Sequence, residues 1–536
     1  MRGFLSLFLV TVLVGGLTMA PQTASAQAPA TSTPIQHVVV IFGENRSFDH
    51  YFGTYPHAMN PLGEPRFTAA AGTPTNINNY NQTPSLLTNN PNLNPANGSS
   101  AANPFRLDRS QALTAGMNHS YGPEQSSFDN GAMDLFPIST GSAGAPPNYY
   151  PPVIFTKGLV MGYYDGNTVT AMWNYAQHFA LNDNSYNSQF GPSTPGAVNL
   201  ISGQTNGIGA NTHLPSSSVI SDGNGGMTLI GDADPYGDVC STTTGTTVQL
   251  TSKNIGDLLN SAGVTWGWFE GGFDLTITNP NGSSQCHRST VSPVTGLTET
   301  DYVPHHQPFQ YYTSTANLQH TRPTSVSMIG HQGDAGNHEY DTHDFFDAIK
   351  AGNFPAVSFL KAPSYQDAHP GNSNPLDEQT FVVDVINFLQ QQAAWSSTAV
   401  VIAYDDSDGW YDHQYSPRVN GSTTTADALN GTGVCNGPAA LPGVNPATTH
   451  AQGRCGYGVR TPMLVISPYA KPNYVDHTVT DQSSVIRFVE DNWLSGQRIG
   501  QGSFDGIANS IASMLNFSQT PNPVLMLSDT TGLVQP

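Results

Sequence analysis

Short apolar runs rich in β-branched residues recur along this chain, and stretches of helical periodicity separate them. A run of this kind, bounded by turn residues, is typical of a strand buried on both faces of a parallel sheet. Such strands are expected at residues 37–42, 265–269, 356–360, 398–404 and 462–467. Apolar residues three and four apart predict helices at 254–262, 378–392 and 481–493, the last with Asp481 as its N-cap. Strands alternating with helices predict an α/β fold, a three-layer sandwich around a mainly parallel central sheet.

Three long segments lack this periodicity. Residues 60–110, 205–250 and 415–455 are rich in Asn, Thr, Gly and Pro, and we expect large loops or small β excursions there. We find no internal repeat. A chain of 536 residues is long enough for one large domain or two ordinary ones, and we favour a single domain over residues 35–536.

The first residues have the pattern of an export signal. Arg2 precedes an apolar stretch over residues 4–19, and residues 24–26 are small, as at a cleavage site. We predict a signal peptide over residues 1–26, a disordered leader over 27–34, and an exported chain that is periplasmic or secreted. No later run approaches roughly 18 apolar residues, so no integral membrane segment is expected in the mature chain.

The charge balance narrows the set of partners. The chain has 17 Lys and Arg against 38 Asp and Glu, a net charge of −21. Nucleic acids and anionic membranes are therefore poor partners, and an anionic substrate needs local cations, either a metal or some of the 17 histidines.

The four cysteines are few and even in number. In an oxidising compartment they are expected to form disulfides. Pairing neighbours, Cys240 with Cys286 and Cys435 with Cys455, closes the shorter loops.

Acidic and amide side chains follow two of the expected strands. Glu44 and Asn45 come after the first strand, and Asp405 and Asp406 follow the strand at 398–404. Ligands in open α/β sheets lie beyond the carboxyl ends of the strands. Hard oxygen donors converging there indicate a divalent cation, while turn and helix-cap roles are the alternative reading.

The string Gly191-Pro192-Ser193-Thr194-Pro195-Gly196 places a hydroxyl between two breaks, just before an apolar run. We expect Ser193 at the exposed start of a helix, where backbone N–H groups favour phosphoryl oxygens. A serine is a weak nucleophile near neutral pH, and a metal on its oxygen would activate it. A plain loop is the alternative.

Several strings in order resemble a known family. Residues 43–53 (GENRSFDHYFG) resemble the opening signature of the bacterial phosphoesterase family that contains phospholipases C and AcpA-type acid phosphatases. Further matches are Asn118–Tyr121, Gly191–Gly196, Asp232–Tyr236, His305–Phe309, His369 and Tyr404–His413. The resemblance extends from about residue 35 to 500. It implies an alkaline-phosphatase-like fold and a phosphoric ester hydrolase.

The resemblance also implies roles for individual residues. Ser193 is the expected nucleophile, and one divalent metal (calcium, zinc or magnesium) is expected on Glu44, Asn45, Ser193, Asp405 and Asp406. The resulting mechanism is an in-line attack that gives a phosphoseryl intermediate.

Histidines complete the implied site. His119, His306 and His369 are expected to face the phosphate, with His306 or His369 as general acid. Asp412 and His413 are expected to support the Asp405–Asp406 turn.

The substrate stays open between two classes. Ser193, the Asp405–Asp406 pair and the Asp232–Tyr236 segment resemble the acid phosphatase subgroup, which favours small phosphomonoesters. A phospholipase C acting on phospholipid head groups is the first alternative. A non-catalytic, calcium-stabilised secreted binding protein is the second. A serine hydrolase is disfavoured because the chain has no G-x-S-x-G string.

Overall fold

A computed structural model gives the fold, and it describes residues 1, 30–142, 156–212, 217–221, 226–242, 244–419, 425–429 and 455–536. An eight-stranded sheet has the order β13-β10-β14-β1-β15-β16-β4-β17. Its strands are β1 (His37–Gly43), β4 (Ala180–Asn182), β10 (Trp266–Glu270), β13 (Glu339–Asp341), β14 (Val357–Lys361), β15 (Thr398–Tyr404), β16 (Met463–Ile466) and β17 (Tyr474–Asp476).

The sheet is mainly parallel, as predicted. Strand β1 pairs in parallel with both β14 and β15, and β10 pairs in parallel with β13 and β14. Strand β16 runs antiparallel to β15 and to β4. The described part of the segment between β15 and β16 contains no α-helix, and a strand reached without a helical crossover can return antiparallel.

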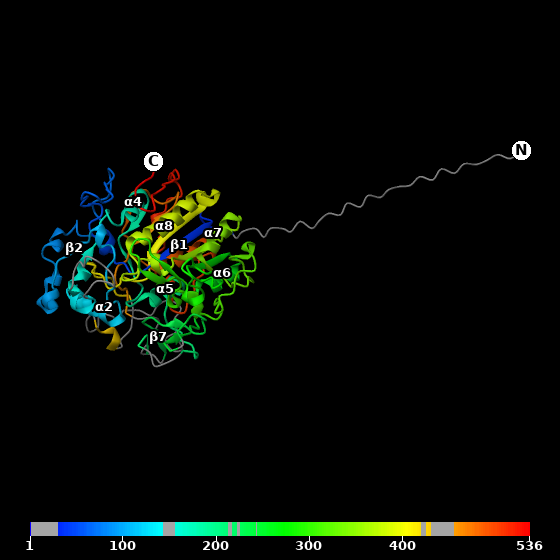
Figure 1. Cartoon of the computed structure of the whole chain (residues 1–536), viewed down its shortest axis with the longest axis horizontal. Helices are drawn as coiled ribbons and strands as arrows, with labels where there is room; N and C mark the ends of the chain where they lie inside the picture. Colours follow the sequence, from blue (N-terminus) through cyan, green and yellow to red (C-terminus); the bar gives the residue numbers. More distant parts are fainter. Residues whose placement is uncertain are drawn as a thin grey trace.

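Helices cover both faces of this sheet, so the predicted three-layer α/β class is confirmed. One layer contains α4 (Thr170–His178), α7 (Thr342–Lys350) and α8 (Pro375–Gln390), and the other contains α5 (Ser193–Ser202), α6 (Ile255–Ala262) and α9 (Ser483–Trp493). Figure 1 shows α7 and α8 on one side of β1 and α5 and α6 on the other. All seven residues of β15 are buried between the layers.

The predicted helices form with small shifts at their N-termini. Helix α6 begins after Asn254, whose side chain accepts from the Asp257 N–H. Helix α8 begins three residues earlier than predicted, because Asn374 caps it and Pro375 fits its first position. The prediction of Asp481 as N-cap is wrong by one residue: Gln482 is the N-cap of α9, although Asp481 still accepts from the Ser483 N–H.

The long segments between the main elements carry short helices and strand pairs. These are α1 (Phe48–Phe52), α2 (Tyr121–Phe128), α3 (Phe136–Ser139), and the pairs β2 (Phe105–Arg106) with β3 (Gly162–Tyr163), β5 (Ser185–Tyr186) with β18 (Thr480–Asp481), β6 (Val219–Ser221) with β7 (Met227–Leu229), β8 (Asp234–Pro235) with β9 (Thr247–Val248), and β11 (Ser289–Val291) with β12 (Thr298–Thr300). Small β excursions therefore occur within residues 205–250.

One of the two expected disulfides is confirmed: Cys240 bonds to Cys286. The expected Cys435–Cys455 pair involves Cys435, which lies outside the described residues, as does nearly all of the predicted signal peptide and part of its leader. Among the described residues, the structure has no helix with the length and apolar character needed to cross a bilayer.

Candidate active site

The carboxyl ends of β1 and β15 place two ligand strings side by side. Gly43 and Tyr404 are register partners on these parallel strands, so the next residues, Glu44 and Asp405, leave the sheet together. The two loops also bond to each other through their backbones, since Arg46 N–H donates to the Asp406 carbonyl at 2.9 Å. The predicted convergence of two distant segments is therefore present.

Ser193 is the first residue of α5, as predicted, but it is only 2% exposed, so the prediction of an exposed position is wrong. The loops that follow β1 and β15 cover it. Gly196 permits this close approach, because a Cβ atom there would lie 2.0 Å from the Asp405 carbonyl oxygen. A helix with any side chain at this position could not bring the hydroxyl as near to the ligand loop.

Oxygen atoms surround the Ser193 hydroxyl. Its Oγ atom lies 2.9 Å from Glu44 Oε2 and 3.2 Å from Asp406 Oδ2. The Asn45 side-chain oxygen is 3.5 Å away. Asp405 joins this group of atoms through Asn45, because its Oδ1 atom accepts from the Asn45 backbone N–H at 3.1 Å. All five predicted metal ligands thus lie in one buried cluster.

The donor atoms around the Ser193 hydroxyl test whether a cation fits here. Glu44 and Asp406 offer carboxylate oxygens, Asn45 offers an amide and Ser193 a hydroxyl. Carboxylate, amide and hydroxyl oxygens are the donor set of a hard divalent ion. The residues therefore fit the metal that the sequence predicts.

The pKa values of the carboxylates give the same result. Burial and the charge of Asp405 raise the pKa of Glu44 well above its ordinary value. Burial, with the charges of Asp405 and Glu124, raises the pKa of Asp406 well above its own. Burial would also raise that of Asp405, but the Lys361 charge, together with hydrogen bonds from Glu44 and from the Asn45 and Asp406 N–H groups, outweighs it and lowers the pKa. With the protein's own charges alone, burial and mutual repulsion thus disfavour the ionised forms of Glu44 and Asp406.

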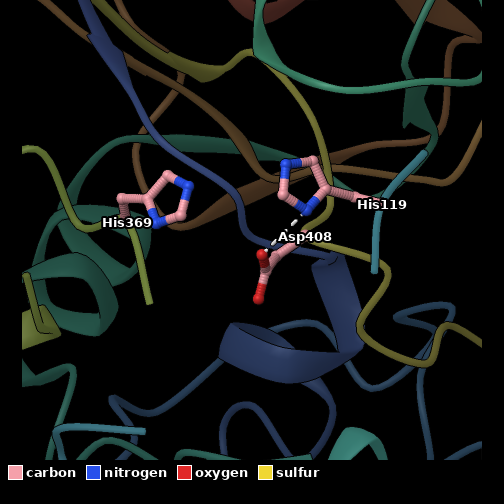
Figure 2. Close-up of side chains that lie close together, drawn as sticks. All are labelled: His119, His369 and Asp408. Carbon is pink, nitrogen blue, oxygen red and sulfur yellow. Dashed lines mark ion pairs between the residues drawn. The ribbon is translucent and has the colours of Figure 1, made fainter. Parts of the chain in front are cut away.

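His119 and His369 face the same place from two loops, on either side of Asp408 in Figure 2. His119 Nδ1 lies 3.1 Å from both the Met117 carbonyl and Asp408 Oδ1, and its Nε2 is 3.4 Å from the Asn45 amide. His369 Nδ1 is 2.7 Å from the Pro370 carbonyl. In both residues Nδ1 is engaged by acceptors, so Nε2 is the ring atom directed toward the other groups of the site.

The two imidazoles differ in charge preference. Burial would lower the pKa of His119, but the charges of Asp406 and Asp408 outweigh it and raise the pKa well above its ordinary value. Burial lowers the pKa of His369.

The third expected histidine, His306, lies behind Glu44. Its Nδ1 atom is 3.3 Å from Glu44 Oε1 and 3.9 Å from Asp367 Oδ2. Burial and the charge of Lys361 lower its pKa well below the ordinary value. Its neighbour His305 points elsewhere, with Nδ1 3.7 Å from Asp234.

Glu124 on α2 joins the two halves of the site. Its Oε2 atom accepts from the Gly191 N–H at 2.8 Å, two residues before the Ser193 hydroxyl. Its Oε1 atom accepts from Ser407 Oγ at 2.7 Å, directly after Asp406. Burial raises the pKa of Glu124 to about 7. This single carboxyl group therefore bonds to both the loop before Ser193 and the loop after β15.

Asp412 and His413 lie outside the cluster around Ser193 and bond to Asp49. Asp412 accepts from the Asp49 backbone N–H at 3.1 Å, and His413 Nδ1 lies 2.6 Å from Asp49 Oδ2. Both belong to a cluster around Arg460, whose guanidinium reaches Asp49 and Asp412 at 3.1 Å each. They connect the loop after β1 to the loop after β15 without contacting Ser193.

A pocket opens beside the serine. It has a volume of about 390 Å³ and is bounded by residues 117–122, Pro192, Ser217, Ser218, Ile230, Gly231 and Asp232. Asp232 borders it at the start of α5, where its Oδ1 atom accepts from the Thr194 N–H at 3.0 Å. The pocket therefore contacts both His119 and Pro192, the residue before Ser193.

Sequence reasoning missed Lys361, Asp367, Glu124 and Arg460. Lys361 could have been found, because it directly follows the apolar run at 356–360 and so lies at the same edge of the sheet as Glu44. Glu124 gives no such signal, since it lies on a short polar helix between long loops.

Comparison with known proteins identifies the family of this chain. The model of the phosphoesterase family matches residues 35–494. The non-hemolytic phospholipase C of Pseudomonas aeruginosa is 25% identical over 93% of this chain and 59% of its own length. Phospholipase C A of Mycobacterium tuberculosis is 23% identical over 92% of this chain and 79% of its own length. The chain thus spans about three fifths of the Pseudomonas relative.

Solved structures resemble the chain only distantly. A protein of the alkaline phosphatase superfamily from Vibrio parahaemolyticus is 12% identical, with a TM-score of 0.28 over 82% of each chain. The phosphonate monoester hydrolase of Silicibacter pomeroyi is 12% identical, with a TM-score of 0.28 over 65% of this chain and 71% of its own.

Proposed function

This chain belongs to the phosphoesterase family, and we propose that it hydrolyses phosphoric esters with Ser193 as its nucleophile. One observation supports this above all others. The Ser193 hydroxyl begins a helix and lies within 2.9 to 3.5 Å of oxygens from Glu44, Asn45 and Asp406. A hydroxyl in such a setting suits attack on phosphorus, because the helix N-terminus favours the phosphoryl oxygens.

One divalent cation belongs to this proposal, with calcium, zinc and magnesium as the candidates. Glu44, Asn45, Ser193, Asp405 and Asp406 would hold it. When bound, it would lower the pKa of the serine hydroxyl and offset negative charge on the phosphoryl group.

The side chains of the site have separate roles in the proposed reaction. Ser193 Oγ attacks phosphorus, the bond from phosphorus to the leaving oxygen breaks, and a phosphoseryl enzyme forms, which water hydrolyses to free serine and phosphate. His119 Nε2 holds a phosphoryl oxygen, since its Nδ1 is fixed by Asp408. The leaving oxygen takes its proton from His369 or His306.

For the substrate we propose small phosphomonoesters, as for an acid phosphatase. Ser193, Asp405-Asp406 and the Asp232–Tyr236 segment support this through their resemblance to that subgroup. A phospholipase C is the second candidate, favoured by the names of the relatives in Pseudomonas and Mycobacterium. The Cys240–Cys286 disulfide supports an exported enzyme, because such bonds form in oxidising compartments.

The test is Ser193→Ala, assayed in parallel on p-nitrophenyl phosphate and on a choline phospholipid across a range of pH. We expect turnover to fall by about 10³-fold or more on the true substrate while the variant stays folded. Ser261→Ala, on the exposed face of α6, is the matched control and should keep full activity. Mass spectrometry of acid-quenched enzyme should find phosphate on the peptide containing Ser193. Unchanged turnover in the variant would reject the nucleophile, and the preferred substrate decides between the two esterase classes.

A further inference from the structure

The ammonium group of Lys361 lies on the side of Glu44 that faces away from Ser193. Lys361 ends β14, and its side chain is 1% exposed. Its Nζ atom forms an ion pair with Glu44 Oε1 and lies 3.7 Å from Asp405 Oδ2. It also lies 5.3 Å from the centre of the ring of Phe42, a residue of β1.

The groups around this ammonium are those that bind metals. Glu44, His306 and Asp367 each offer one ligand atom, and these atoms lie within 4.8 Å of one another. Among the described residues, Asp367 Oδ2 and Asp405 Oδ2 are both buried without a hydrogen-bond partner. Three carboxylates and one imidazole thus converge on a place where one lysine provides the positive charge.

Two of these carboxylates, Glu44 and Asp405, also contact the groups around Ser193. Glu44 directs Oε2 toward the Ser193 hydroxyl and Oε1 toward Lys361. Asp405 receives the Asn45 N–H on Oδ1 and faces Lys361 with Oδ2. Carboxylates shared in this way are what a pair of cations about 4 Å apart requires.

We propose that the Lys361 ammonium occupies the second cation position of this centre, and that without it Glu44, His306 and Asp367 form a binding site for a second divalent ion. The inference rests on the proposed function for the first cation. It assigns Lys361 the role of a built-in counter-charge, which keeps the centre to one exchangeable metal.

Metal analysis of purified protein tests this directly. Wild type, Lys361→Ala, Lys361→Met and the double variant Lys361→Ala/Asp367→Asn are equilibrated with zinc, or separately with calcium, and the bound ions per chain are counted. We expect Lys361→Ala to hold one ion more than wild type. The double variant should return to the wild-type count, because a ligand is lost. Lys361→Met should not gain an ion, since its side chain fills the space. Lys350→Ala, at an exposed ion pair, is the control and should match wild type.

A folded Lys361→Ala chain with the wild-type count would overturn the inference, and so would an extra ion that survives Asp367→Asn. Should Lys361→Ala fail to fold, refolding in the presence of zinc and of calcium replaces the count. The inference predicts rescue by at least one of the two ions, and failure with both would reject it. The wild-type count judges the proposed function separately, because a chain that holds no ion would contradict the proposed metal centre.

Discussion

Two acidic clusters lie on the same pair of loops, and they are neutralised in opposite ways. In the outer cluster, Asp49 and Asp412 are both bonded by the buried guanidinium of Arg460. In the inner cluster, Glu44 and Asp406 converge on a hydroxyl group, and the nearest ammonium, Lys361, lies on the far side of Glu44. The outer cluster is paired with the protein's own charges, whereas the residues of the inner one fit the divalent cation that we propose.

The outer cluster joins the two loops, and the inner cluster contains the groups proposed for the reaction. Arg460 also accepts the Phe48 N–H on its carbonyl and stacks over the Phe48 ring at 4.2 Å. It thereby fixes the loop after β1 against the loop after β15, so that the inner oxygens stay close although they repel one another. We therefore expect the loop geometry to persist when the proposed cation of the inner cluster is removed.

The largest effect is expected from removing the metal. Exhaustive dialysis against a chelator should lower turnover by at least about 100-fold, because charge on the phosphoryl group is no longer offset. It should also lower the free energy of unfolding by about 3 kcal/mol, as expected when a ligand present at 100 times its dissociation constant is withdrawn. Turnover and urea midpoints are measured before and after adding back zinc, calcium or magnesium. Full activity after chelation would end the distinction between the two clusters.

The next effect is expected in the outer cluster. Arg460→Ala leaves Asp49 and Asp412 buried without their shared partner and should cost about 3–5 kcal/mol of unfolding free energy, measured by urea denaturation. Lys350→Ala, at an exposed pair with Asp347, should change it by less than about 0.5 kcal/mol. Added metal should not restore the Arg460 variant. Restoration by metal would show that the two clusters share one ion.

A smaller effect is expected at Glu124, which spans both loops. Glu124→Ala removes the acceptor for the Gly191 N–H and should cost about 1–3 kcal/mol in stability, with a lower kcat. Glu124→Gln can still accept from Gly191 and donate to Ser407, so it should recover most of the kcat. If glutamine and alanine lower kcat equally, with unchanged stability, Glu124 acts through its charge and does not position the loops.

The sequence predicted the inner cluster better than the outer one. Glu44 and Asp405 could be found because each directly follows a buried strand, and parallel strands end at the same edge of a sheet. The Gly-Pro and Pro-Gly breaks likewise marked the start of α5 at Ser193. The burial of Ser193 could not be predicted, since it depends on loops from distant parts of the chain.

The outer cluster depends on Arg460, whose role has no local signal. Arg460 stands in a stretch without periodicity, 48 residues after Asp412, and its partner Asp49 lies more than 400 residues away. The reversed direction of β16 was missed for a similar reason, because an apolar run reads the same in both directions. Pairings set by the return path of a long segment become visible only in the folded chain.

The smallest expected effect is a shift in acid stability at the edge of the outer cluster. Burial alone would raise the pKa of Asp49, but the charge and hydrogen bonds of His413, with the charge of Arg460, outweigh it and lower the pKa. A carboxyl group with a lowered pKa in the fold stabilises the protein above its unfolded pKa, near 3.9, and this contribution is lost as pH falls through the folded value. His413→Ala should raise the folded pKa of Asp49, so the loss begins at a higher pH. We expect the acid-unfolding midpoint to rise by less than about one pH unit.

His57→Ala, at an exposed position, should leave it unchanged. A midpoint that falls or stays fixed in the His413 variant would mean that Arg460 alone keeps Asp49 ionised, and the outer cluster would then reduce to a single arginine and its two acids.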